Sequence, residues 1–246
     1  MHTSLQEILA VRGTADNNAA PRFDIYAGIH KGVRLMLADL ITSAGRVDAG
    51  DPASVQQLAD KVEAAADFCV SHLEHENAFV HPALERAQPG SSQRIATEHV
   101  EHERDIEALR AHARALPGCA PEDRPAACRA LYHAVSLFAA HNLAHMHLEE
   151  TEHNAVLWAH LDDAAIMAVH GQILAALSPA EMTASLHWML PALAPAERLG
   201  MLGGMRNAPA PVFGAVLALA RERLDDSAWG ALARGLGIPV APGLTA

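Results

Sequence analysis

Two segments of the chain concentrate side chains that can bind metal ions. HLEHENAFVHPAL, from His72 to Leu84, and HMHLEETEH, from His145 to His153, each contain one His-x-x-x-Glu unit. Most of the 16 histidines lie between His72 and His160. Imidazole and carboxylate donors together suit iron, manganese or zinc. Which of these side chains meet depends on the elements that carry them.

The chain is predicted to be all-α. Helix formers dominate, β-branched runs are absent, and clusters of Pro, Gly and Ser separate four long segments. Short connections between long helices make neighbours antiparallel, so residues 22–160 are expected to form an up-down-up-down four-helix bundle. We place its helices at about 22–45, 53–86, 92–116 and 123–159.

A second helical region is expected to follow the bundle. It is apolar and richer in Met, Pro and Gly, and Ser178-Pro179-Ala180-Glu181 is a helix start with a Ser cap and a Glu three residues later. We predict four or five short helices over 161–237 and a flexible tail over 238–246. The region could be a homo-oligomerisation or signal-output module, or simply packing that caps the bundle.

Helical phase selects the inward polar residues of the second helix. Each residue advances a helix by about 100°. Leu58, Val62, Ala65 and Cys69 share one direction, and His72 and Glu76 lie within that apolar stripe. His75 lies about 100° away, and Glu74 and His81 point to the opposite side.

The other three helices also carry inward histidines. In the fourth helix the stripe contains His145 and Glu149, with His141 and Glu152 inward one turn away, whereas His147 and Glu150 face outward. His30 is central in the first helix, one turn after an inward Tyr26. In the third helix His99 and His102 lie inside the stripe and Glu103 lies at its edge. We assign the remaining histidines solvated or supporting roles: His75, His81, His112, His147, His153 and His160.

These inward groups are expected to meet at one level. His30 lies about 22 Å before the end of its helix and His72 about 28 Å after the start of the next. Buried carboxylates and imidazoles are costly without partners, and a metal removes that cost. Two glutamates that bridge two cations, with histidines in the terminal positions, would form a dinuclear centre. A metal-free structural bundle is the alternative.

The motif order resembles that of hemerythrin-like (HHE cation-binding) domains. His30 in IHKGVR, His72-x-x-x-Glu76 in HENAFVHPAL, His99 in EHVEHERDIEAL and His145-x-x-x-Glu149 in HMHLEETEH carry the likeness over roughly residues 22–160. The resemblance implies a four-helix bundle with two iron ions, bridged by oxo or hydroxo, for which manganese or zinc could substitute. It implies that Glu76 and Glu149 bridge the irons, with His30 and His72 on one and His99 and His145 on the other.

The third helix departs from the pattern of oxygen-carrying hemerythrins. Those proteins have two histidines spaced H-x-x-x-H, whereas this chain has His99-x-x-His102, or His99 with Glu103 at the matching spacing. Without His102 as a ligand, one iron would keep an extra open site or take an oxygen ligand.

Two functions fit such a centre. The first is binding of O2 or a related diatomic such as NO for sensing, storage or protection; the second is a di-iron redox enzyme that decomposes peroxide. A ferritin-like site needs Glu-x-x-His on two helices, and only Glu150-x-x-His153 qualifies. The His-Glu-x-x-His motif of zinc proteases is absent from the sequence.

Charge and composition restrict the partners. With a net charge of -11 and no Lys/Arg cluster, we expect no nucleic-acid or membrane partner. The first residues show no basic region followed by an apolar run, so we expect a cytoplasmic protein. Three cysteines without a C-x-x-C pair indicate reduced thiols.

Overall fold

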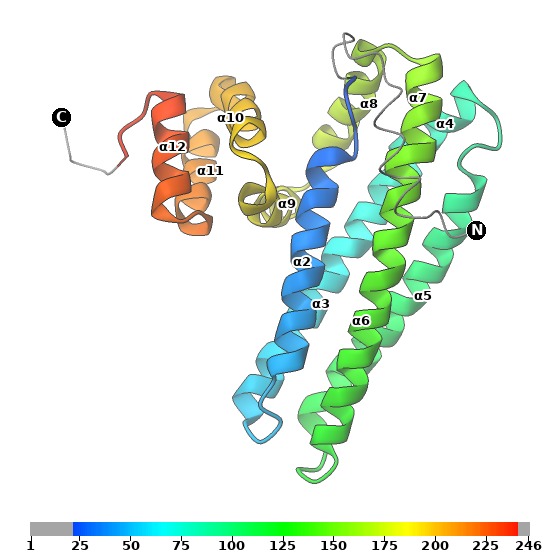
Figure 1. The fold of residues 1–246 in the computed structure, drawn as a ribbon, viewed down its shortest axis with the longest axis vertical. Coiled ribbons are helices and arrows are strands. Elements are labelled where there is room, and N and C mark those ends of the chain that lie inside the picture. The colour runs from blue at the N-terminus through cyan, green and yellow to red at the C-terminus, as the bar shows by residue number, and fades with distance from the viewer. Residues whose placement is uncertain (1–21, 241–246) are drawn as a thin grey trace, which may run out of the picture.

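Four long antiparallel helical segments form a bundle in the computed structural model, which describes residues 22–240 (Figure 1). The predicted all-α bundle is therefore confirmed. Short α-helices, α4 and α7, extend the second and fourth segments. The bundle consists of α2 (Ala27–Arg46), α3 (Pro52–His75), α4 (His81–Ala87), α5 (Gln93–Ala115), α6 (Arg124–Leu148) and α7 (Asn154–His160).

Aspartate side chains bind backbone N–H groups at the start of the first two helices. Asp24 accepts hydrogen bonds from the backbone N–H groups of Tyr26 and Ala27, so α2 begins at Ala27 rather than at the predicted residue 22. Asp51 caps α3 in the same way, and Pro52 occupies the first helical position, where a missing N–H costs nothing.

Two π-helical turns interrupt the second and fourth segments. These turns, η2 (Glu76–Val80) and η4 (Glu149–His153), each begin at a glutamate of a His-x-x-x-Glu unit. The N–H of His81 bonds to the carbonyl of Glu76, and the N–H of Asn154 bonds to that of Glu149, five residues back in both cases. Each π turn contains one extra residue. Side-chain directions predicted from 3.6 residues per turn are therefore wrong for the residues that follow it.

The bundle has two apolar cores, one on each side of these turns. The larger core fills the space between α2, α3, α5 and α6, and includes Leu37, Val62 and Leu131. The smaller core, with Leu84, Leu157 and Ile166, joins the other end of the bundle to α8 (Asp163–Ala176). The polar level between them is therefore enclosed by apolar packing at both ends.

Within the described residues five α-helices follow the bundle, where the sequence predicted four or five. After α8, the remaining four share their own apolar core, and Ile238 packs against it. The predicted capping box is present: Ser178 accepts from the N–H of Glu181, whose carboxylate accepts from the N–H of Ser178. Residues 241–246 of the predicted tail lie outside the described residues. The four helices are α9 (Pro179–Ala192), α10 (Pro195–Gly204), α11 (Ala210–Arg223) and α12 (Asp226–Leu236).

Helix α9 attaches this region to the bundle by packing on α2 (Figure 1). A Cβ added at Gly32 would lie 3.2 Å from the backbone nitrogen of Met189, so the two helices approach closely because Gly32 has no side chain. Lys31 on α2 also pairs with Glu197 on α10, with Nζ 2.5 Å from Oε1. Among the described residues, no helix is both long and apolar enough to span a bilayer.

Candidate metal centre

Six histidines and two glutamates gather inside the bundle at the level of the π turns. Every one of these side chains is buried except His72, whose side chain is 13% exposed. Their ligating atoms form three groups, and the atoms within each group lie within 4.8 Å of one another. The groups are His30, His72 and Glu76; Glu76, His99, His145 and Glu149; and His81, Glu149 and His153.

Glu76 lies between the first two groups. Its Oε1 is 3.2 Å from His72 Nε2 and 3.7 Å from His30 Nε2. Its Oε2 is 3.6 Å from His99 Nε2. The carboxylate therefore presents one oxygen to each group.

Glu149 has the same bridging position from the opposite helix. Its Oε2 is 3.4 Å from His30 Nε2, on the side of the first group. Its Oε1 is 3.4 Å from His145 Nε2 and 3.6 Å from His99 Nε2. Each of the two carboxylates therefore faces both histidine groups, as a ligand that bridges two ions would have to do.

Hydrogen bonds from Nδ1 orient three of the histidines. Each Nδ1–H donates to a side-chain oxygen outside the three groups, which turns Nε2 toward the glutamates. Metal-binding histidines commonly have such a partner. The pairs are His30 with Glu150 Oε1 at 3.0 Å, His99 with Asn77 Oδ1 at 2.8 Å, and His145 with Glu98 Oε2 at 2.9 Å.

Several inward-facing atoms lack hydrogen-bond partners, whereas His99 Nε2 and His145 Nε2 lie 3.1 Å apart and bond to each other. Among the described residues, none of the four oxygens of Glu76 and Glu149 accepts a hydrogen bond, and His30 Nε2 is also unpaired. A buried polar group left unpaired costs about 1–3 kcal/mol, and more when charged. Cations between these atoms would satisfy all of them, so the residues present fit a pair of metal ions.

The surroundings keep the carboxylates ionised. Burial alone would raise the pKa of Glu149, but the His145 and His99 imidazoles beside it hold that pKa well below its usual range. Burial would likewise lower the pKa of His30, yet Glu150 and Glu76 outweigh it and raise the pKa to about 9. The centre thus combines stable negative charge with imidazoles that attract protons or metal ions.

His81 lies in the core, so the prediction that it points away was wrong. Five α-helical residues after Glu76 would rotate it by about 140°, but the π turn brings it back to the same face. Its ring stacks on His99 at 4.9 Å between centroids. Burial, followed by the nearby His99, lowers the pKa of His81 to about 4, so the imidazole is neutral at pH 7.

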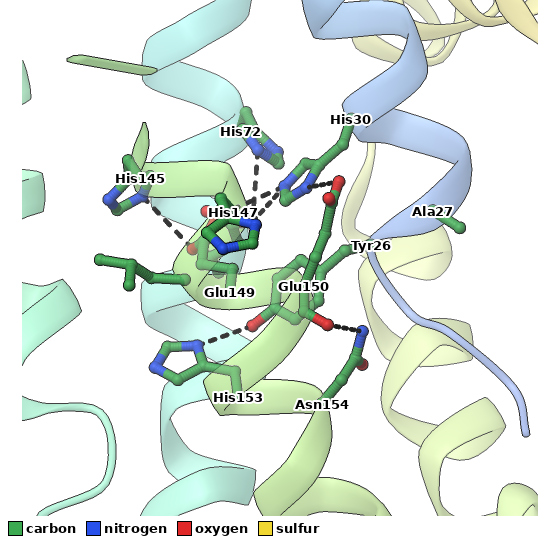
Figure 2. Close-up of polar contacts among 12 residues, drawn as sticks. Tyr26, Ala27, His30, His72, His145, His147, Glu149, Glu150, His153 and Asn154 are labelled. Atoms are coloured by element: carbon green, nitrogen blue, oxygen red, sulfur yellow. Dashed lines mark hydrogen bonds and ion pairs between the residues drawn. The ribbon is translucent and has the colours of Figure 1, made fainter. Parts of the chain in front are cut away.

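His153 is also a core residue, although the sequence suggested only a solvated or supporting role. It is 1% exposed, and its Nδ1 lies 2.9 Å from the hydroxyl of the buried Tyr26 (Figure 2). One local signal for the first π turn was available: Pro82 interrupts an otherwise helical segment right after His81. The π turn that ends at His153 has no comparable signal.

The third helix places His102 next to the centre. His102 is buried and its ring lies 4.6 Å from that of His145, but it belongs to none of the three groups. Glu103 is exposed. The inward direction predicted for His102 agrees with the structure, and Glu103 points away from the metal groups.

Three predictions for the fourth segment were wrong. His141 and Glu152 are both exposed. The inward face of α6 passes through Asn142, about 100° from His141, and the π turn changes the direction in which Glu152 points. Glu150 was predicted to face outward, yet it accepts from His30 and from both terminal nitrogens of Arg34, at 2.6 and 2.9 Å. Figure 2 shows this carboxylate reaching across to His30.

A surface groove between α5 and α6 leads to the centre. Its volume is about 500 Å³, and both His102 and His145 line it. Charged side chains such as Arg94, Glu101 and Asp105 line the remainder. Small polar molecules therefore have a path to one ligand of the second group.

Comparison with known families matches the bundle to one of them. The family model of the hemerythrin HHE cation binding domain matches residues 23–156, more than half of the chain and the whole segment that carries the three groups. Neither the search of curated proteins nor that of solved structures found a match.

Proposed function

We propose, from the premise that the chain belongs to the hemerythrin HHE cation-binding family, that its bundle binds two iron ions and, through them, O2 or a related diatomic such as NO. The role would be sensing, storage or protection. The observation that supports two ions is that Glu76 and Glu149 each present one oxygen to each of two histidine groups.

The proposed ligands follow from these groups. His30 and His72 would hold one ion, His99 and His145 the other, and the two glutamates would bridge them. The same donors suit manganese or zinc, which we expect to substitute in vitro. Bound iron would supply a redox-active Lewis acid to which a diatomic molecule can attach.

Enclosure favours a small ligand. The candidate ligating atoms lie between two apolar cores, and the groove between α5 and α6 reaches His145. His102 lines the groove beside His145, with the two rings 4.6 Å apart, so it is positioned to control that approach rather than to complete the ligand set.

Peroxide decomposition is the second candidate. The observation in its favour is the buried Tyr26 hydroxyl, held against His153 at 2.9 Å, since proton-donating groups near a redox metal assist cleavage of an O–O bond. Burial first, and then Glu149, raise the pKa of Tyr26 well above its ordinary value, so the phenol keeps its proton.

Metal analysis with a visible spectrum tests the metal centre. Wild type purified from iron-supplemented cells should contain at least two irons per chain and show diferric absorption. His145→Ala should lose both. His133→Ala, an exposed histidine on the same helix, should lose neither. Wild type that stays colourless and metal-free after anaerobic iron loading would overturn the proposal.

Ligand assays separate the two functions. Reversible spectral changes on cycling between O2 and argon, or on NO addition, would support gas binding if peroxide is not consumed. Metal-dependent peroxide consumption that falls in Tyr26→Phe would favour the enzyme instead.

A further inference from the structure

We propose that the core holds a further metal position, formed by His81, His153 and Glu149, for a divalent transition cation such as iron(II). It would lie beside the two positions proposed above and share Glu149 with them. The inference rests on the proposed function, because the position shares Glu149 with the proposed two-ion centre.

The three side chains form a group of buried, unpaired donors. One ligating atom from each lies within 4.8 Å of the others, and the side chains are 7%, 1% and 0% exposed for His81, His153 and Glu149. Within residues 22–240, the Nε2 atoms of both histidines and both oxygens of Glu149 have no hydrogen-bond partner. Three buried side chains with unpaired polar atoms thus lie close together.

The two π turns are what create the group. Each turn starts at a glutamate of the centre, and each brings a second histidine to the core: His81 directly after η2, and His153 as the last residue of η4. π turns are rare in helices and are frequent at functional sites. That both segments widen at the same level, each with a histidine as the result, points to a shared ligand.

Neighbouring side chains fix the direction of both imidazoles. In the tautomer that binds a cation, Nδ1–H of His153 donates to the Tyr26 hydroxyl oxygen, which leaves the lone pair on Nε2 for the ion. His81 is held between two rings, stacked on His99 at 4.9 Å and edge-on to His153 at 5.7 Å. The imidazoles are therefore oriented before any ion binds, as a metal site requires.

The donor set defines the class of ion. Two histidines and one carboxylate with open coordination positions are typical of non-haem iron(II) sites and of catalytic zinc sites. Such a set leaves room for water or a small ligand. The three donors do not match calcium or magnesium, which prefer oxygen ligands.

Anomalous diffraction tests the position directly. Wild-type crystals would be prepared after anaerobic loading with iron(II), and data would be collected on both sides of the iron absorption edge. A peak within bonding distance of His81 Nε2 and His153 Nε2 supports the proposal. Peaks confined to the other two groups, with water hydrogen-bonded between these histidines, overturn it and leave the proposed function intact.

Metal counting gives an independent readout in solution. Wild type should bind three irons per chain by elemental analysis, and a His81→Leu/His153→Leu double variant should bind two. His133→Leu, at an exposed site on α6, should still bind three. Two irons in wild type would contradict this inference alone, whereas none would contradict both it and the proposed function. If the double variant fails to fold, the diffraction experiment on wild type still decides.

Discussion

Glu149→Gln should remove the stabilisation that metal gives to the whole bundle. The substitution keeps the size of the side chain but removes its charge and one acceptor oxygen. Glu149 Oε2 lies 3.4 Å from His30 Nε2, and its Oε1 lies 3.4 Å from His145 Nε2. One change therefore weakens both histidine groups at once.

The expected magnitude follows from the linkage between binding and folding. At a free metal concentration 100 times the dissociation constant, a site that exists only in the folded state adds about 2.7 kcal/mol. For a chain of this size, each kcal/mol raises the melting temperature by about 2–4 °C, so wild type should gain about 5–11 °C on loading. Glu149→Gln should gain less than about 1 °C under the same conditions.

Scanning calorimetry of chelated and metal-loaded protein would measure this gain. The comparison uses the rise in melting temperature on metal loading within each variant. The substitution also changes the stability of the metal-free protein, because it removes a buried charge beside three imidazoles. Glu152→Gln is the matched control, since Glu152 is exposed three residues further along. A Glu149→Gln variant that retains more than half of the wild-type gain would refute the bridging role.

Three further outcomes are expected elsewhere in the fold. Gly32→Ala should be less stable than Gly171→Ala by about 1–3 kcal/mol in chemical denaturation. A Cβ at Gly32 would lie 3.2 Å from the backbone of α9, whereas one at Gly171 would have no neighbour within 4 Å. Equal stabilities would contradict the close packing of α2 and α9. Hydrogen bonds from Ser178, then Ser71, lower the pKa of Glu181 to about 2. The ionised Glu181 therefore stabilises the fold fully above about pH 4.5, and this stabilisation is lost as the pH falls toward 2. In urea unfolding the wild type should lose its stability advantage over Glu181→Gln across that range, and a stability difference independent of pH would contradict this prediction. Burial raises the pKa of the Cys69 thiol to about 12, so iodoacetamide at pH 8 should label the half-exposed Cys119 first by mass spectrometry, and early labelling of Cys69 would show that its core opens.

The sequence was sufficient to predict the bundle and the inward direction of the side chains in the first two groups. Apolar residues at helical spacing place His30, His72 and His99 on inward faces, and short connections make the helices antiparallel, so these side chains reach one level. The inference needs only the regular α-helical period. It succeeds because the helices are regular up to Glu76 and Glu149, the first residues of the two π turns.

Only the tertiary structure decided what lies beyond those glutamates. A π turn changes the phase of every later side chain, and its cost is offset by contacts with other helices that no local pattern records. In the structure the side chains of His81 and His153 are therefore buried in the core. The hydrogen bonds of His30 with Glu150 and of His145 with Glu98 join residues on different helices, so local spacing could not predict them. Period and spacing determined which helices carry inward histidines and glutamates, and packing between helices determined how many of these side chains each one brings to the centre.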